Sequence, residues 1–253
     1  MIGRRTFTLG ALTALGTLGL AGTGTAAPGP RVRNVVLVHG AYADGSSWAP
    51  VVTRLQQAGL RVTSVQNPLT SLAEDVAATT RALDRQDGPT VLAGHSYGGM
   101  VVSQAGGHPR VASLVYVAAR APEAGEDYPA LAARFPTPPA NAGIVERAGF
   151  RQLSQEAFLR DFANGLPRHK ALALYAAQGP VAASLFTTRT TAAAWHEHPT
   201  FYAVSRRDRT TSPELQRFLA GRMGAHTVEL DSGHLSIQTH PDEIARLVLA
   251  AAR

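Results

Sequence analysis

Short apolar runs alternate with helical patterns along most of this 253-residue chain, and this alternation restricts its fold more than any other feature. Several of the runs are continuously apolar, as in strands that are buried on both faces of a sheet. This order is typical of a parallel sheet with crossover helices, so we expect an α/β fold. The six expected strands are residues 34–38, 60–65, 90–94, 112–118, 200–205 and 227–230.

Capping signals mark where several of the helices begin and end. Gly59 is expected to end the first helix of the repeating part, and Ser71 with Glu74 forms a capping box for the next. Ser212 followed by Pro213 predicts another helix start, and Pro241 begins an expected final helix.

The alternation stops between residues 120 and 199. Prolines and glycines there separate three expected helices, near 155–164, 167–178 and 181–194, and no run predicts a strand. We therefore expect a small helical cap over the carboxyl edge of the sheet, within one domain that spans residues 27–253. Several apolar side chains of the cap are available either to line a pocket or to hold the cap on the body: Leu131, Phe135, Phe158, Leu172, Leu174, Tyr175, Leu185, Phe186 and Trp195.

The first 26 residues are typical of an export signal. Arg4 and Arg5 precede an uncharged stretch that runs to Pro30, and this stretch is too rich in glycine for a stable membrane span. The arginine pair followed by Phe7 resembles the twin-arginine signal of bacteria, with cleavage expected after Ala26. We expect export by the twin-arginine machinery to the periplasm or the medium.

Composition excludes several classes of site. The chain has no cysteine, which excludes disulfide scaffolds, thiolate metal sites and a cysteine nucleophile. Its formal net charge is +6, but the basic residues are scattered, so we expect no nucleic-acid partner. His196 and His198 flank Glu197, yet this spacing without further ligands is weak evidence for a metal, and we expect neither metal nor cofactor.

The segment Gly94-His95-Ser96-Tyr97-Gly98 joins an expected strand directly to an expected helix. Glycines two residues before and two after Ser96 leave room for a sharp turn, which would lift the serine hydroxyl above the sheet edge. Free amides at the start of the following helix would face any developing anion. This context predicts that Ser96 is a nucleophile.

A serine nucleophile needs a base, and the base needs a carboxylate. His234 follows the last expected strand and Asp208 follows the strand before it, so both should lie at the same sheet edge as Ser96. Asp231 and Glu123 are the competing acids. The other histidines are expected to brace loops, as His39 and His95 would, or to lie at surfaces and helix ends. The amides of Ala41, after the first strand, and Tyr97 are the expected oxyanion hole.

These residues together resemble the α/β-hydrolase family across the whole mature chain, and most of all its compact branch of methylesterases, hydroxynitrile lyases and bacterial esterases. The resemblance rests on residues 37–41, 94–99, 208–210, 231–234 and 240–241. It implies the α/β-hydrolase fold, with a parallel sheet of about six strands flanked by helices. Related lyases generally carry threonine at the position of Gly40 and lysine at that of Leu235, so both departures favour hydrolysis.

The expected function is therefore a secreted serine hydrolase that acts on small carboxylic esters through an acyl-enzyme. Other acyl transfer, amide hydrolysis or a lyase reaction on the same fold is one alternative. A secreted binding protein without turnover is another. The natural ester remains open because many substrates share this fold and this set of residues.

Overall fold

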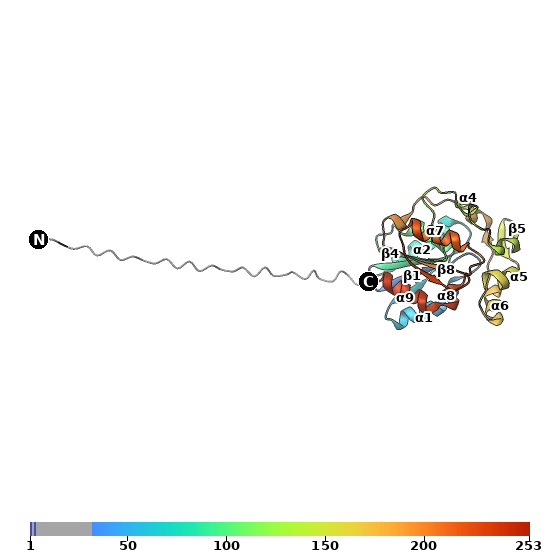
Figure 1. Ribbon diagram of the computed structural model, residues 1–253, viewed down its shortest axis with the longest axis horizontal. Coiled ribbons are helices and arrows are strands. Elements are labelled where there is room, and N and C mark those ends of the chain that lie inside the picture. Colours follow the sequence, from blue (N-terminus) through green and yellow to red (C-terminus); the bar gives the residue numbers. More distant parts are fainter. Residues whose placement is uncertain (2, 4–31) are drawn as a thin grey trace.

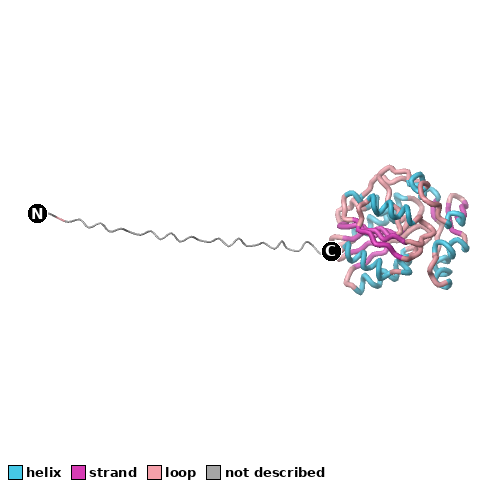
Figure 2. The backbone as a smooth tube through the Cα atoms, in the orientation of Figure 1, coloured by secondary structure: helices cyan, strands magenta, loops and turns pink. Residues whose placement is uncertain are grey.

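The computed structural model describes residues 1, 3 and 32–253. The expected export signal therefore lies outside the described residues, apart from residues 1 and 3. The described chain forms a central sheet with helices on both faces and a cap at one edge (Figures 1 and 2).

The central sheet has six strands, and all neighbouring pairs are parallel. Their order is β2-β1-β3-β4-β8-β9, which places β1 and β3 in the interior, where Val38 pairs with Gly94 at the carboxyl end. The six-stranded parallel sheet expected from the sequence is confirmed. Its strands are β1 (Asn34–Val38), β2 (Arg61–Ser64), β3 (Thr90–His95), β4 (Val111–Val117), β8 (Thr200–Ser205) and β9 (His226–Leu230).

Both faces of the sheet are covered because successive side chains of a strand point to opposite sides. In β1, Val35 and Leu37 pack with one hydrophobic cluster, whereas Val36 and Val38 pack with the other. The helices α1 (Ala49–Gln57) and α9 (Pro241–Ala251) cover the first face, and α2 (Leu72–Asp84), α3 (Gly98–Ala105) and α7 (Pro213–Arg222) cover the second (Figure 1).

The helix ends lie close to where the capping signals predict them. Gly59 has φ of 85° just after α1 ends. The Ser71 hydroxyl accepts a hydrogen bond from the Glu74 amide at 3.2 Å, and the Ser212 hydroxyl accepts one from Leu215 at the start of α7. These bonds satisfy amides that have no partner within the helix.

The cap is not entirely helical, so the expectation of an all-helical cap is wrong. It contains a three-stranded antiparallel sheet made of β5 (Ile144–Arg147), β6 (Phe150–Leu153) and β7 (Val181–Ala182). Ala148 and Gly149 connect the first two strands with φ of 50° and 79°, which is the geometry of a two-residue hairpin turn. Alanine is not typical of such a turn, so the sequence carried little sign of the hairpin.

The helical part of the cap is also shorter than expected. Residues 155–164 form one α-helical turn, α5 (Gln155–Ala157), followed by a π-helical turn over Phe158–Phe162. The helix expected at 167–178 is present as α6 (Arg168–Ala176), and α4 (Tyr128–Ala132) precedes the hairpin. The helix expected at 181–194 is absent, because β7 and a short 3-10 turn at Ala183–Phe186 occupy its first half.

The start of α3 approaches the end of β4 so closely that only glycine fits at position 99. A Cβ atom there would lie 2.0 Å from the Arg120 carbonyl oxygen, which is backbone and cannot rotate away. We predict that Gly99→Ala lowers the free energy of unfolding by at least about 2 kcal/mol.

Gly107→Ala is the matched control, because a Cβ atom at that position meets nothing within 4 Å. Gly107→Ala should leave the free energy of unfolding unchanged or raise it slightly, because alanine restricts the conformations of the unfolded chain. Urea unfolding of both variants checks this. Equal stabilities of the two variants would contradict the steric account.

Candidate active site

Ser96 lies on a tight turn between β3 and α3. Its φ is 53°, in the left-handed region that residues other than glycine rarely adopt. Cβ atoms at Gly94 and Gly98 would lie 2.7 Å and 2.6 Å from backbone oxygens of Gly98 and Val38. The two glycines therefore let β1, β3 and α3 meet closely enough to hold the serine in this conformation.

Left-handed backbone is concentrated at the carboxyl edge of the sheet. Tyr42 follows β1 with φ of 61°, and Ala118 directly follows β4 with φ of 45°. Together with Ser96 they mark the ends of three adjacent strands. Strained backbone of this kind collects at functional sites because the surrounding structure must hold it.

His234 and Asp208 form a buried hydrogen-bonded pair at this edge. The His234 Nδ1 atom lies 2.7 Å from an Asp208 carboxylate oxygen, and both side chains are fully buried. Because a carboxylate only accepts, Nδ1 carries the proton and Nε2 is left as the basic nitrogen. Within the described residues, Nε2 has no hydrogen-bond partner.

Three further donors hold the Asp208 carboxylate. The amides of Thr210 and Thr211 donate to one oxygen at 2.7 and 2.9 Å, and Gln216 Nε2 donates to the other at 2.8 Å. Gln216 also accepts from the Ser205 amide, so it ties α7 to the end of β8. Sequence reasoning missed Gln216; its one signal was a polar residue on the apolar face of an expected helix.

His95 connects the turn that carries Ser96 to the loop that carries His234. Its Nε2 atom donates to the His234 carbonyl oxygen at 3.0 Å, and the two rings lie 4.7 Å apart. Burial holds the pKa of His95 well below its ordinary value, with the nearby His234 adding to the effect. Since His95 immediately precedes Ser96, this bond brings His234 to the serine turn.

His39 braces the loop after β1. Its Nδ1 atom donates to the Gly40 carbonyl at 2.9 Å and its Nε2 atom accepts from the Asn67 amide at 2.9 Å. Burial lowers the pKa of His39, while the Gly40 carbonyl and the Asp44 charge oppose this. Both histidines therefore have the bracing contacts expected for them.

The structure brings together some of the candidate residues and separates others. Ser96, His95 and His234 meet at one edge, but the structure records no hydrogen bond between the Ser96 hydroxyl and His234 Nε2. Such bonds are often long before substrate binds. The competing acids lie elsewhere: Asp231 pairs with Arg207 at the surface, and Glu123 accepts from His196 at 2.9 Å.

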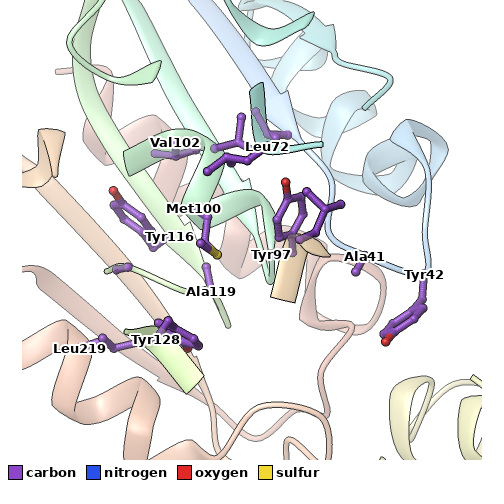
Figure 3. Packing of buried hydrophobic residues seen from close by; sticks show 14 of the residues in the cluster. Ala41, Tyr42, Leu72, Tyr97, Met100, Val102, Tyr116, Ala119, Tyr128 and Leu219 are labelled. Carbon is purple, nitrogen blue, oxygen red and sulfur yellow. The ribbon is translucent and has the colours of Figure 1, made fainter. Parts of the chain in front are cut away.

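The amides expected to bind an oxyanion border the same pocket as Ser96. Ala41 and Tyr97 both line it, and Figure 3 shows Ala41 beside Tyr97 with Tyr42 farther out. Within the described chain, neither amide donates a recorded hydrogen bond. The Tyr97 ring is held in place by its hydroxyl, which donates to the buried Asp75 carboxylate at 2.7 Å.

The pocket above Ser96 has a volume of about 630 Å³ and is walled largely by the cap. Of the apolar cap residues expected to line a pocket, only Phe186 lines this one. Phe158 and Leu174 line a much smaller cavity of about 10 Å³, and Trp195 is buried in the core. Most of these side chains therefore hold the cap on the body.

Neither metal ligation nor membrane spanning is indicated for residues 1, 3 and 32–253. No group of three or more histidine, aspartate or glutamate side chains there could hold a metal ion. None of the helices in this part of the chain combines the length and the apolar character that crossing a bilayer requires.

Because burial lowers the pKa of His39 and His95, we predict that the stability of the fold depends on pH. A histidine whose pKa is lowered by folding stays neutral in the fold while the unfolded chain takes up a proton below its own pKa of about 6.5. The free energy of unfolding should therefore be largest above about pH 6.5 and fall as pH decreases, by at most about 1.4 kcal/mol per pH unit for each such histidine.

His39→Gln tests this, because glutamine offers both a donor for Gly40 and an acceptor for Asn67 but does not titrate. Chemical unfolding from pH 7.5 to pH 5 should give a shallower slope for the variant than for the wild type. Parallel curves would contradict the assignment of His39 to this effect.

Comparison with known proteins places these features in a family. A model described as the alpha/beta hydrolase family matches residues 35–247. A carbendazim hydrolyzing esterase from Nocardioides sp. (strain SG-4G) is 32% identical over 126 residues, which are 44% of this chain and 52% of that enzyme. The match thus spans about half of the esterase's length.

Solved structures resemble the whole domain. Polyneuridine aldehyde esterase superposes with a TM-score of 0.76 at 17% identity, covering 88% of this chain and 100% of that one. A pyrethroid hydrolase from Sphingobium faniae JZ-2 superposes with a TM-score of 0.72 at 21% identity, covering 87% and 97%. These likenesses establish the fold, and the family model, which spans nearly all of the described domain, shows that the chain belongs to the alpha/beta hydrolase family.

Proposed function

We propose that the chain is a serine hydrolase that cleaves carboxylic esters. The observation that carries the proposal is the buried hydrogen bond between His234 Nδ1 and Asp208, next to a left-handed serine turn. The bond leaves a basic nitrogen without a partner in the described chain, and a pocket opens above the serine. Together these supply a base, an oriented nucleophile and room for a substrate.

In this mechanism the Ser96 hydroxyl attacks the ester carbonyl while His234 Nε2 takes its proton. The Ala41 and Tyr97 amides stabilise the oxyanion, each contributing about 3 kcal/mol to lowering the barrier. His234 then gives the proton to the leaving alcohol, and an acyl group remains on Ser96. Water, activated by the same histidine, releases the acid and restores the serine.

Two observations favour hydrolysis over a lyase reaction. A Cβ atom at Gly40 would lie 2.7 Å from the Ser96 Cβ atom, so the threonine that related lyases carry there would crowd the serine. Leu235, at the position of their lysine, is buried and apolar. The carbendazim hydrolyzing esterase supports hydrolysis of an ester and the pyrethroid hydrolase supports hydrolysis, although each name describes only its own protein.

Export remains a proposal that rests on the sequence of residues 1–26. The arginine pair at Arg4 and Arg5 and the uncharged stretch after it support recognition by the twin-arginine machinery. Removal of these residues would leave the family domain intact, since the family match begins at residue 35.

A fluorophosphonate probe tests the nucleophile, because it reacts with an activated serine hydroxyl. The folded wild type should be labelled, and Ser96→Ala should not. Ser46→Ala is the control and should label normally, since Ser46 is exposed and does not line the pocket. Absence of labelling in the wild type would favour a binding protein, and labelling of Ser96→Ala would move the nucleophile elsewhere.

Substitution of the acid tests the triad. Asp208→Asn should lower kcat on a 4-nitrophenyl ester by about 10⁴-fold, because the amide no longer fixes the histidine tautomer or stabilises the imidazolium. Asp231→Asn should leave kcat nearly unchanged, since Asp231 pairs with arginines at the surface. If Asp231→Asn lowered kcat strongly and Asp208→Asn did not, the catalytic acid would be Asp231 instead.

A further inference from the structure

The pocket above Ser96 contains an arginine without a carboxylate partner. Arg120 lines the pocket together with Ser96, and its side chain is only partly exposed. A guanidinium group has five N–H donors. Within the described residues, the one hydrogen bond recorded for this side chain is a long one, of 3.8 Å, to the sulfur of Met100.

The acids around this pocket are already paired with other groups. Glu146, the one acid that lines the pocket, forms an ion pair with Arg151 at 2.8 Å. The remaining nearby acids are each paired as well: Glu126 with Arg222, Asp127 with Arg189, and Asp208 with His234. Arg151, which also lines the pocket, balances Glu146, so the lining carries a net positive charge from Arg120, with which no acidic side chain of the described chain pairs.

Backbone contacts hold Arg120 beside the nucleophile. Its amide donates to the Ser96 carbonyl oxygen at 3.0 Å, and its own carbonyl fits against Gly99, where a side chain would collide. The preceding residue, Ala119, exchanges two hydrogen bonds with the Tyr202 hydroxyl, at 2.6 and 3.0 Å. The guanidinium group is thus anchored within one side-chain length of the serine turn.

Aromatic rings aim the guanidinium group within the pocket. Its central carbon lies 4.9 Å from the centre of the Tyr128 ring and 5.1 Å from that of Phe186. Phe186 also contacts the Tyr42 ring, which stacks on it with 5.9 Å between the ring centres, and the Arg151 guanidinium group, whose central carbon lies 5.1 Å from its ring centre. Stacking of this kind orients a guanidinium group but leaves its edge donors free for an acceptor in the plane.

Two phenol groups add to the same wall. The hydroxyls of Tyr42 and Tyr128 are buried and have no hydrogen-bond partner in the described part of the chain. Burial raises the pKa of each to about 12, while the charge of Arg120 opposes the rise, so both hydroxyls stay protonated and keep their capacity to donate.

We propose that Arg120 binds a carboxylate carried by the ester substrate, a few bonds from the scissile carbonyl. This inference rests on the proposed esterase function and names the substrate class for it: half-esters of dicarboxylic acids, or esters whose alcohol carries a carboxylate. The planar guanidinium fork fits a carboxylate with two parallel hydrogen bonds, which a neutral ester cannot accept. A partly buried cation without a counter-charge gains most from such a ligand.

Matched esters test the proposal on the acyl side and on the alcohol side. Mono-4-nitrophenyl adipate and 4-nitrophenyl hexanoate have acyl groups of equal length and differ by the terminal carboxylate. 4-Carboxyphenyl butyrate and 4-carbamoylphenyl butyrate make the same comparison in the alcohol. The wild type should show a kcat/KM for the charged member of at least one pair that is about 10- to 100-fold higher, and this preference should decrease with salt.

Arg120→Met removes the charge and retains an unbranched side chain that can pack on Tyr128 and Phe186. It should raise KM for the charged ester and abolish the preference, with kcat/KM for the neutral ester nearly unchanged. Arg120→Lys should retain part of the preference, because the charge remains without the bidentate fork. Arg246→Met, an exposed arginine on α9 outside the pocket lining, is the control for net charge and should behave as the wild type.

The outcomes separate this inference from the proposed function. Hydrolysis of neutral and charged esters with equal kcat/KM in both pairs would overturn the carboxylate assignment and leave the esterase intact. Equal losses on both members of a pair in Arg120→Met would also overturn it, since they indicate a role in packing alone. Failure of the wild type to hydrolyse any of the four esters, without probe labelling of Ser96, would overturn the esterase and this inference with it.

Discussion

The close approach of backbone to backbone at the carboxyl edge of the sheet is the constraint on which the rest of the structure depends. Glycines at positions 94, 98 and 99 let the start of α3 lie against β1, β3 and the segment after β4 at distances that no side chain would allow. This contact holds Ser96 in a left-handed conformation and places it in the lining of the pocket. The same contact positions Arg120, whose carbonyl lies against Gly99. One packing arrangement therefore positions both the proposed nucleophile and the charged wall of the pocket.

A buried polar network in the loops after β8 and β9 completes the site at the same carboxyl edge of the sheet. Asp208 has four hydrogen-bond donors, of which His234 is one and Gln216 is another, so its carboxylate is satisfied in the core without an arginine. A buried carboxylate whose two oxygens are both paired is held rigidly, because rearrangement would leave a buried charged atom unsatisfied. His95 links this network to the serine turn through the His234 carbonyl. The pair is thus preorganised by elements that are distant in sequence.

The cap has a different role from the sheet edge. It supplies most of the pocket wall, from α4, the β5–β6 hairpin and Phe186, whereas the chemistry proposed for the site comes from the sheet edge. Substrate choice would then depend on residues that the catalytic steps do not use. Arg120 lies at the junction of the two parts, since its backbone contacts the serine turn and its guanidinium group stacks on rings of the cap.

The amino-acid sequence by itself determined the parallel sheet, its six strands and the position of the Ser96 turn, because these depend on local patterns of apolar residues, caps and glycines. It also pointed to Asp208 and His234, since both follow strands that end at one edge. Tertiary structure alone decided what depends on contacts between distant segments. Three features left little or no local pattern, because each is set by which side chains the fold brings together. They are the contact of Gln216 with the Asp208 carboxylate, the cap hairpin through Ala148 and, among the described residues, the absence of an acid paired with Arg120.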